Sequence, residues 1–425
     1  MLVGSEVRRV AVIGGIRIPF ARAHGAYATA GNQQMLAATL RALVERHGLR
    51  GVRLGDVVAG AVIKHSSQWN LAREAVLDSG LAPETPGLTM QRACGTSLEA
   101  AISIGSRIAL GQIDSGIAAG VDTISDAPIV YSREYQQLLL ASFRGRTPWQ
   151  KLRPWLGLRP RHFRPVTGGA SEPRTGLSMG QHCEQMARSW QIGRTLQDEL
   201  ACRSHQLAHA AWESGFMSEL TVPFLGLARD NNVRAGSTVE QLAKLRPSFA
   251  ADGTLTAGNS TPMTDGAAAV LLASEDWARA RGLPVQAWLS YGKVAAVDFV
   301  GGEGLLMAPA YAVPRMLADA GLRLLEFDFY EIHEAFAAQL LCTLKAWESP
   351  EFCRERLGLA EPLGTIDRAR LNVRGGSVAI GHPFAATGAR VLATLAKLLA
   401  ERGSGRGLIS ICTAGGMGVT AILER

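Results

Sequence analysis

The sequence of 425 residues lacks the long hydrophobic runs of membrane proteins. No stretch has 18 consecutive apolar residues, so we expect no membrane-spanning helix. The opening MLVGSEVRRVAVIGG has charged residues but no apolar core followed by small residues, so we expect no secretory signal peptide. Six cysteines show no regular spacing, which is typical of a reducing compartment. The sequence therefore predicts a cytoplasmic protein.

Signatures of several ligand classes are also missing. The apolar stretch 7–20 contains a glycine pair but no GxGxxG, which argues against a dinucleotide-binding fold. Aromatic residues make up only 6% and are not interleaved with the basic residues along the whole chain, and no nucleic-acid module signature is present, so no nucleic-acid partner is predicted despite a net charge of +7. That charge suits anionic metabolites or a membrane surface equally well. Several histidines and cysteines lie close together in the sequence, namely His182, Cys183, Cys202, His205 and His209. Their spacing fits the faces of helices better than the ligands of a zinc site, so we expect no metal.

What is present is an alternation of strand-like and helical segments, which predicts an α/β fold. Residues 91–125 and 373–424 follow the same plan, namely a reactive residue beside glycines, a helix, a short turn and a strand ending in glycine. A duplicated α/β core explains this repetition. We place its N-terminal half at 1–125, completed by about 258–280, and its C-terminal half at 281–425.

Residues 126–257 differ in composition and are predicted to be an inserted loop domain. Within it, the stretch 144–164 has seven Lys or Arg and no acidic residue, with tryptophans and leucines between them. Prolines every six residues rule out one long helix, so we expect a short helical hairpin at the surface. Helices are predicted to follow at 178–190 and 195–215.

The stretch QRACGTSLEAA, residues 91–101, contains the first candidate for chemistry, Cys94. Thr96 and Glu99 have the spacing of a capping box, which predicts a helix that begins near Cys94. The N-terminus of that helix should favour the thiolate, the form that attacks carbonyl carbons. The alternative is a buried structural cysteine, which is the commoner role of a lone cysteine.

Three further candidates lie at junctions between a strand and a helix or turn. His382 is in a glycine-rich turn, Cys412 follows the apolar strand LISI, and His333 follows the strand-like FDFY. Each taken singly is more often a packing residue. Together with Cys94 they should lie on one face of the sheet, where the sites of α/β proteins form.

Five motifs in chain order resemble the thiolase family, and they span nearly the whole chain: QRACGTSLEAA, NSTPMTDGAAAVLL, HEAFAAQ, NVRGGSVAIGHPFAATGAR and CTAGGMGVTAILE. The HEAF variant and GLSMGQHCEQMAR resemble the degradative 3-ketoacyl-CoA thiolases that act as β-subunits of the trifunctional complex of fatty-acid oxidation. The resemblance implies a thiolase-like duplicated α/β core, described as two five-layered α-β-α-β-α halves. It also implies cleavage of 3-ketoacyl-CoA by CoA, reversible by Claisen condensation.

The resemblance implies a role for each candidate residue. Cys94 would be the nucleophile that carries the acyl group, His382 its proton acceptor, and Cys412 the acid and base at the α-carbon. His333 stands where many members have an asparagine that holds a water in the first oxyanion hole. The second oxyanion hole would be formed by the backbone N–H groups of Cys94 and Ala414, the latter a position often occupied by glycine.

The resemblance further implies how substrates and partners are bound. Thr261, Met307 and Phe336 would line the channel for pantetheine and acyl chain, and Met179 would belong to the loop over it. CoA would be a substrate, with no permanently bound cofactor. Partners would be a second copy of the chain, a hydratase/dehydrogenase α-subunit, or a membrane contacted through 144–164. Alternatively, 144–164 is a solvated loop whose arginines attract CoA phosphates.

Three other functions remain open from the sequence. A biosynthetic acetoacetyl-CoA thiolase would share every motif. A decarboxylating ketosynthase uses one cysteine and two histidines, and Cys412 argues against it because such enzymes have an asparagine-containing turn there. A lipid carrier without turnover would not need Cys94, His382 or Cys412. Acyl chain length and physiological direction are not determined by the motifs.

Overall fold

The computed structural model describes residues 7–167 and 171–425; residues 1–6 of the predicted N-terminal half and 168–170 of the predicted insert lie outside the described ranges. The core is a sheet with the strand order β10-β11-β12-β9-β1-β8-β5-β3-β4, and β2 pairs with β8. The strands are β1 (Val10–Arg17), β2 (Ala21–Arg22), β3 (Asp56–Gly60), β4 (Gly87–Thr89), β5 (Ser115–Asp122), β8 (Thr264–Ser274), β9 (Ala287–Ala296), β10 (Phe329–Ile332), β11 (Arg406–Thr413) and β12 (Met417–Glu424).

The strand pairing repeats itself. In the first half, β3 pairs with β5 in parallel, β5 pairs with β8 antiparallel, and β8 pairs with β1 antiparallel. In the second half, β10 pairs with β11 in parallel, β11 pairs with β12 antiparallel, and β12 pairs with β9 antiparallel. The two halves meet where β1 pairs with β9 at Ala11–Trp288 and Val12–Ala287. This pattern confirms the predicted duplication of the core, and β8 pairs with both β5 and β1 of the first half.

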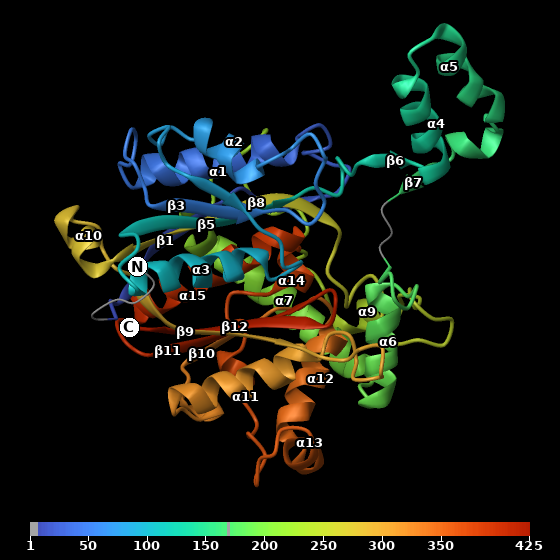
Figure 1. Ribbon diagram of the computed structural model, residues 1–425. Coiled ribbons are helices and arrows are strands. Elements are labelled where there is room, and N and C mark those ends of the chain that lie inside the picture. The colour runs from blue at the N-terminus through green and yellow to red at the C-terminus, as the bar shows by residue number, and fades with distance from the viewer. Residues whose placement is uncertain (1–6, 168–170) are drawn as a thin grey trace.

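The helices and the two parts of the sheet form five layers in the order α-β-α-β-α (Figure 1). The first outer layer contains α1 (Asn32–Arg46) and α2 (Leu71–Leu77), and the opposite outer layer contains α11 (Ala308–Ala320) and α12 (Ala337–Glu348). Between the two parts of the sheet lie α3 (Thr96–Ala109) and α15 (Thr387–Arg402). The fold class is thus confirmed, and the five layers are formed by both halves together because each contributes one helix to the middle layer.

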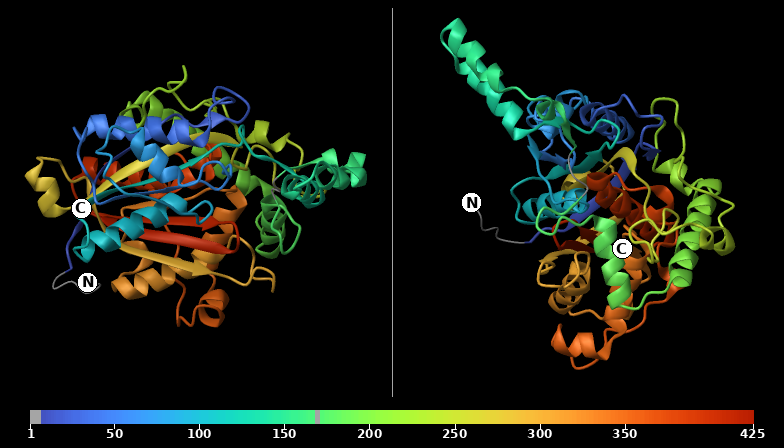
Figure 2. Two further views of the ribbon diagram at one scale, coloured as in Figure 1. Left: turned by 45° about the horizontal axis from the view of Figure 1, so that its top comes forward. Right: turned by 90° about the vertical axis from the view of Figure 1, so that its right-hand side faces the viewer.

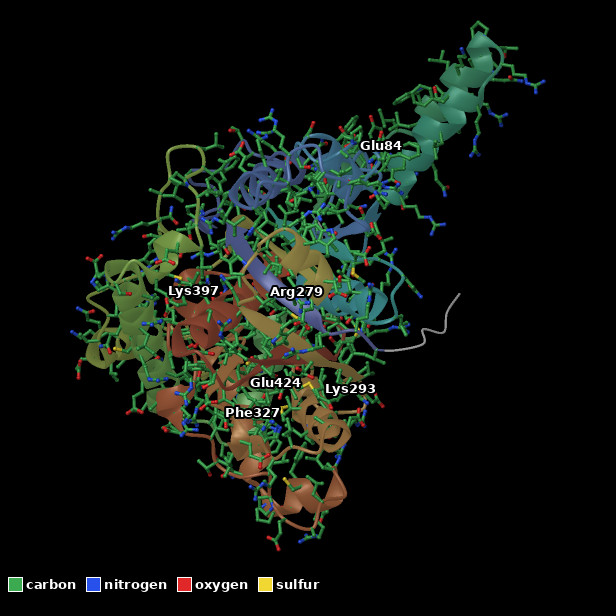
Figure 3. All side chains as sticks on the ribbon, turned by 90° about the vertical axis from the view of Figure 1, so that its left-hand side faces the viewer. Glu84, Arg279, Lys293, Phe327, Lys397 and Glu424 are labelled. Carbon is green, nitrogen blue, oxygen red and sulfur yellow. The ribbon has the colours of Figure 1, made fainter. Side chains whose placement is uncertain are left out.

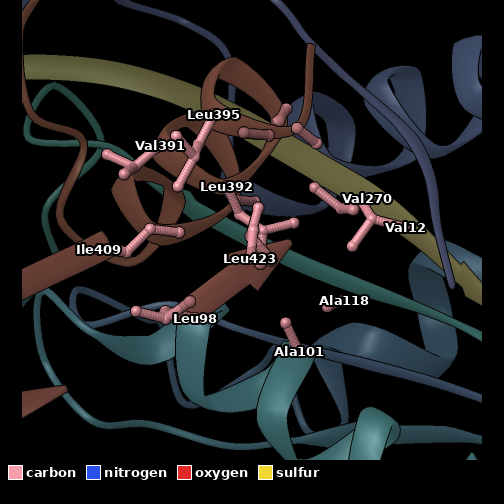
Figure 4. Close-up of a cluster of buried hydrophobic side chains, with 14 of the residues drawn as sticks. Val12, Leu98, Ala101, Ala118, Val270, Val391, Leu392, Leu395, Ile409 and Leu423 are labelled. Carbon is pink, nitrogen blue, oxygen red and sulfur yellow. The ribbon is translucent and has the colours of Figure 1, made fainter. Parts of the chain in front are cut away.

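The middle layer is held by a buried apolar cluster (Figure 4). Its side chains come from α3, from α15 and from both parts of the sheet, among them Leu98, Ala101, Leu392, Leu395, Val12, Val270, Ile409 and Leu423. Full burial of one such aliphatic side chain contributes roughly 1.5–3 kcal/mol. The cluster therefore holds α3, which begins just after Cys94, against α15, which begins at Thr387 after the turn that contains His382.

The segment between β5 and β8, which we call the loop domain, contains helices and one short ribbon. The predicted helices at 178–190 and 195–215 are present as α6 (Met179–Ser189) and α7 (Arg194–Glu213), with the short α8 (Phe216–Glu219) and α9 (Val239–Ala243) after them. Ahead of them, β6 (Ile129–Tyr131) and β7 (Pro165–Thr167) pair into a ribbon that leads to α4 (Arg133–Arg144) and α5 (Pro148–Leu152). These helices project from the body of the molecule (Figures 1 and 2).

We name residues 129–167 the hairpin. It is longer than the predicted 144–164 because α4 forms its first arm, and α5 with two short 3-10 turns, Arg153–Gly157 and Pro160–Phe163, forms the second. The remaining helices are α10 (Glu275–Ala280), α13 (Pro350–Glu355) and α14 (Ser377–Ile380). Among the residues that the structure describes, no helix has the length and apolar character needed to cross a membrane.

Candidate active site

Cys94 lies in a tight turn between β4 and α3. Ala93, just before it, has a φ of 42°, a left-handed conformation that is uncommon for a residue other than glycine. Such strain is often found at functional sites. Gly95, just after it, packs so closely on the second half that a Cβ there would lie 2.6 Å from Val419 Cγ2. The turn therefore carries Cys94 to the boundary between the two halves.

The predicted capping box is wrong. The N-cap of α3 is Gly95, which makes no side-chain capping bond. The Thr96 hydroxyl instead donates to the Ala93 carbonyl at 2.7 Å and accepts from the Arg92 N–H at 2.9 Å. Thr96 thus stabilises the strained turn around Cys94 rather than the first turn of the helix.

The predicted preference of Cys94 for the thiolate is also wrong for the resting protein. Desolvation by the surrounding protein raises the pKa of the Cys94 thiol to about 12, although N–H groups of Ala414 and of Cys94 itself act in the opposite direction. The residue is nevertheless partly exposed, whereas the other five cysteines are buried. Cys94 is therefore accessible but protonated, and it needs a nearby base to become a nucleophile.

His382 can be that base. It lies in the turn between α14 and α15, where its backbone N–H donates to Thr264 Oγ1 at 2.7 Å. Its Nδ1 is 2.5 Å from Thr387 Oγ1, and its buried Nε2 finds no hydrogen-bond partner among the described residues. Burial, and next the charge of Arg390, lower the pKa of His382 to about 3. The ring is therefore neutral at physiological pH. Its Nδ1 is hydrogen-bonded to Thr387, and its Nε2 has no hydrogen-bond partner among the described residues.

His333 lies beside His382, directly after β10. The centroids of the two imidazole rings are 4.1 Å apart. The backbone N–H of His333 donates to the Ser410 carbonyl at 2.8 Å, and its Nδ1 is 2.9 Å from Ser377 Oγ. Its Nε2 is buried and lacks a partner within the described ranges. Burial, the neighbouring His382 and Arg390 lower the pKa of His333 well below its usual value, so this ring is neutral as well.

Cys412 is the second-last residue of β11 and is buried. Burial, and next the proximity of Cys94, raise the pKa of Cys412 well above its usual value. The turn after β11 contains Ala414, whose N–H is directed at the Cys94 sulfur. The next N–H, that of Gly415, donates to a carboxylate oxygen of Glu172 at 2.7 Å. The loop domain therefore contacts the same turn that brings Cys412 and Ala414 to Cys94.

The predicted channel residues surround Cys412. Met307 and Phe336 belong to one buried apolar cluster with Cys412, and Met179, at the start of α6, packs against that cluster. Thr261 is close by, because its N–H donates to the Ala335 carbonyl at 3.1 Å and its hydroxyl donates to the Ser377 carbonyl at 2.8 Å. All four predicted channel residues thus lie next to the candidate active site.

Sequence reasoning missed the residues that support these side chains. Ser377 and Arg390 contact each other at 3.0 Å beside His333. Glu172 reaches the Cys412 turn from the loop domain, and Thr387 holds His382. A serine within the apolar run of GGSVAI was a usable signal for Ser377, but nothing in the sequence distinguishes Glu172 from other acidic loop residues.

Two thiols and a backbone N–H donor lie together in this site. Two neutral imidazoles lie beside each other, and the turn that follows His382 is hydrogen-bonded to the start of α3, next to Cys94. A thiol next to a free imidazole nitrogen can attack a carbonyl carbon, and N–H donors can stabilise the oxyanion that results. The second thiol, protonated and buried, can deliver a proton to a carbanion. Within residues 7–167 and 171–425, no group of three or more His, Cys, Asp or Glu could hold a metal ion.

Two family models match the chain, the thiolase N-terminal domain over residues 10–276 and the thiolase C-terminal domain over residues 284–425. The chain belongs to the thiolase family. A 3-ketoacyl-CoA thiolase of Pectobacterium atrosepticum is 43% identical to this thiolase over 98% of the chain and 96% of the relative. A 3-ketoacyl-CoA thiolase of Yersinia pestis is 40% identical over 100% of the chain and 98% of the relative.

A solved structure is also similar to this thiolase over nearly its whole length. The crystal structure of the Bacillus anthracis acetyl-CoA acetyltransferase superposes with a TM-score of 0.84 and 30% identity, covering 99% of this chain and 100% of the other. The boundary between the two family models falls at residues 277–283, just before β9. The models therefore divide the chain where the second half of the sheet begins.

Proposed function

We propose that this thiolase cleaves 3-ketoacyl-CoA with CoA, giving acetyl-CoA and an acyl-CoA shortened by two carbons, as in fatty-acid β-oxidation. The observation that carries the proposal is that both later turns reach the Cys94 segment. The Ala414 N–H of the Cys412 turn is directed at the Cys94 sulfur, and the turn after His382 is hydrogen-bonded to Ser97 in the first turn of α3. The names of the relatives that are 40–43% identical over the whole chain support the substrate class. CoA and its thioesters are substrates in this reaction.

In the first half of the reaction, the Cys94 sulfur attacks the 3-keto carbon while its proton passes to Nε2 of His382. The N–H groups of Cys94 and Ala414 stabilise the oxyanion that forms on this carbon, and a hydrogen bond from His333 stabilises the negative charge that next develops on the oxygen of the acetyl thioester. The bond between C2 and C3 then breaks, and Cys412 gives its proton to C2. Acetyl-CoA leaves, and the remaining acyl group is bound to Cys94 as a thioester.

In the second half, the CoA thiol gives its proton to the Cys412 thiolate and attacks the acyl carbon on Cys94. The N–H groups of Cys94 and Ala414 stabilise this second oxyanion. The Cys94 sulfur leaves and takes back the proton held by His382. The shortened acyl-CoA departs, and each side chain has regained its starting protonation state.

The surroundings of the site suit a CoA thioester. Met179, Met307 and Phe336 offer an apolar wall next to Cys412, and Thr261 offers a hydroxyl at its edge. We assign these residues to the channel for pantetheine and the acyl chain. The net charge of +7 favours the approach of the CoA phosphates.

Thiolysis of 3-ketoacyl-CoA substrates from C4 to C16 with free CoA tests the proposal directly. We expect turnover of substrates longer than acetoacetyl-CoA, with Cys94→Ser inactive as the matched control. Turnover of acetoacetyl-CoA alone would indicate a biosynthetic thiolase instead. Release of carbon dioxide from malonyl-CoA would indicate a ketosynthase, and binding of acyl-CoA without any turnover would indicate a carrier.

A second proposal concerns the hairpin, which we infer contacts an anionic lipid surface. The stretch 144–164 has seven Lys or Arg and no acidic residue. Large apolar side chains of the hairpin lie in solvent, with exposed fractions of 81% for Phe143, 62% for Trp149, 71% for Leu156 and 53% for Phe163. Side chains that end in nitrogen project from the hairpin (Figure 3). Basic residues with aromatic and aliphatic side chains are typical of interfacial membrane contacts.

Sedimentation with anionic liposomes tests the lipid contact. The full chain should sediment with them at low salt and be released at high salt, because exposed charges are screened within about 10 Å at 0.1 M. A variant with 144–164 replaced by a short Gly/Ser linker should keep its thiolysis rate and lose sedimentation. Equal sedimentation of both proteins, or binding only to a hydratase/dehydrogenase subunit, would contradict a lipid contact.

We also propose that the chain forms a homodimer or a larger homo-oligomer. The short edge strand β4 ends the sheet next to the Cys94 segment, and Leu88 at its centre is exposed. An edge strand with free backbone groups can pair with a second chain. Light scattering after size exclusion should give at least twice the monomer mass of 45.2 kDa; a monomer mass would contradict this proposal. A cytoplasmic location stays a prediction.

A further inference from the structure

The side chain of Ser377 lies between His333 and Arg390. Ser377 is the first residue of α14 and is fully buried. Its Oγ is 2.9 Å from His333 Nδ1 and 3.0 Å from Arg390 Nη2. Its carbonyl accepts a hydrogen bond from Thr261 Oγ1 at 2.8 Å. The hydroxyl and the carbonyl of Ser377 are therefore hydrogen-bonded to residues of the candidate active site.

The chemistry of these groups fixes the direction of each hydrogen bond. A guanidinium group only donates, so the Ser377 oxygen accepts from Arg390. The hydroxyl hydrogen of Ser377 then has one acceptor among its contacts in the described ranges, which is Nδ1 of His333. If Nδ1 carried the proton, the hydroxyl hydrogen would be buried without an acceptor, which is unfavourable.

We propose that Ser377, itself held by Arg390, is a positioning residue that fixes His333 in the tautomer with hydrogen on Nε2. This nitrogen is the one that is buried without a partner next to His382. Fixing its hydrogen gives the substrate carbonyl a permanent hydrogen-bond donor at the place where negative charge develops. The role of the tautomer in catalysis rests on the proposed thiolase function, whereas the tautomer itself does not.

To accept the proton of Cys94, the neighbouring His382 needs the opposite tautomer. Its Nδ1 contacts Thr387 Oγ1 at 2.5 Å, and a hydroxyl can accept from an Nδ1–H group. Nε2 of His382 then carries a lone pair, which the proton acceptor of Cys94 requires. Two adjacent neutral imidazoles thus present one donor and one acceptor. Without Ser377, either nitrogen of His333 could carry its hydrogen, and part of the population would present a lone pair to the oxyanion.

Nitrogen-15 NMR of the histidine rings tests the tautomer in the free protein. Couplings from ring hydrogens distinguish a protonated from an unprotonated nitrogen, and the His333→Asn variant assigns the His333 signals by their loss. We expect His333 to be protonated on Nε2 in the wild type, mixed between the two tautomers in Ser377→Ala, and restored in Ser377→Thr, which keeps the hydroxyl. Protonation on Nδ1 in the wild type would overturn the proposal.

Kinetics test the action through His333. Ser377→Ala should lower kcat about tenfold with little change in KM, since a change that affects only the transition state lowers kcat. In the His333→Asn background the same substitution should have less than a twofold effect, because no imidazole is left to orient. An equal loss in both backgrounds would show a general structural role and overturn the proposal. An inactive wild type with His333 protonated on Nε2 would contradict the proposed function and leave the tautomer assignment standing.

Discussion

His382→Asn should reduce the sensitivity of this thiolase to acid. The pKa of His382 is lowered to about 3 in the folded protein, mainly by burial, from its ordinary value of 6.5. Above pH 6.5 the ring is neutral in both the folded and the unfolded chain, so it has no effect on stability. Below pH 6.5 only the unfolded chain binds the proton, and folding stability falls until about pH 3. At pH 5 the loss is 1.5 pH units times 1.36 kcal/mol, or about 2 kcal/mol.

Urea unfolding at pH 8 and pH 5, at one protein concentration, measures this loss. Between pH 8 and pH 5 the free energy of unfolding should fall in both proteins. The fall should be about 2 kcal/mol smaller in His382→Asn than in the wild type. His209 is exposed, so His209→Asn should follow the wild type. Equal losses in wild type and His382→Asn would refute burial of a neutral His382 in the folded protein.

Thiolysis rates of variants at three further residues test the roles of these residues. Cys412→Ala should spare acylation by a simple acyl-CoA but lower thiolysis at least about 100-fold, since it removes the proton donor to C2; undiminished thiolysis would remove Cys412 from the mechanism. His333→Asn should keep measurable activity because an amide also donates; complete loss would indicate obligatory proton transfer. Glu172→Ala should lower kcat about tenfold, or ~1.4 kcal/mol, by freeing the Gly415 N–H, while Glu172→Gln should keep most activity. Equal rates in both Glu172 variants would contradict that role.

The fold and the reactive residues could be predicted because their signals are local. The helices α6 and α7 begin and end within a few residues of the predicted ranges 178–190 and 195–215. Cys94 and His382 lie in glycine-rich turns just before long helices, and the duplication of the chain indicated that both turns meet at one place. The motifs therefore predict a candidate site from the sequence alone.

The supporting contacts could not be predicted because they join residues far apart in the chain. Ser377 and His333 are 44 positions apart, and Glu172 and Gly415 are 243 positions apart. The state of Cys94 was predicted wrongly for a related reason. The field of a helix N-terminus is a local effect, whereas the desolvation that raises the pKa of Cys94 comes from the packing of both halves around it.

Mass spectrometry of the enzyme after mixing with a 3-ketoacyl-CoA in the absence of CoA tests the central claim most directly. The account predicts one added acyl group, of the substrate chain shortened by two carbons, bound as a thioester to Cys94. The adduct should disappear when CoA is added, and Cys94→Ser should form none. An acyl group found on Cys412 with Cys94 unmodified would contradict the account.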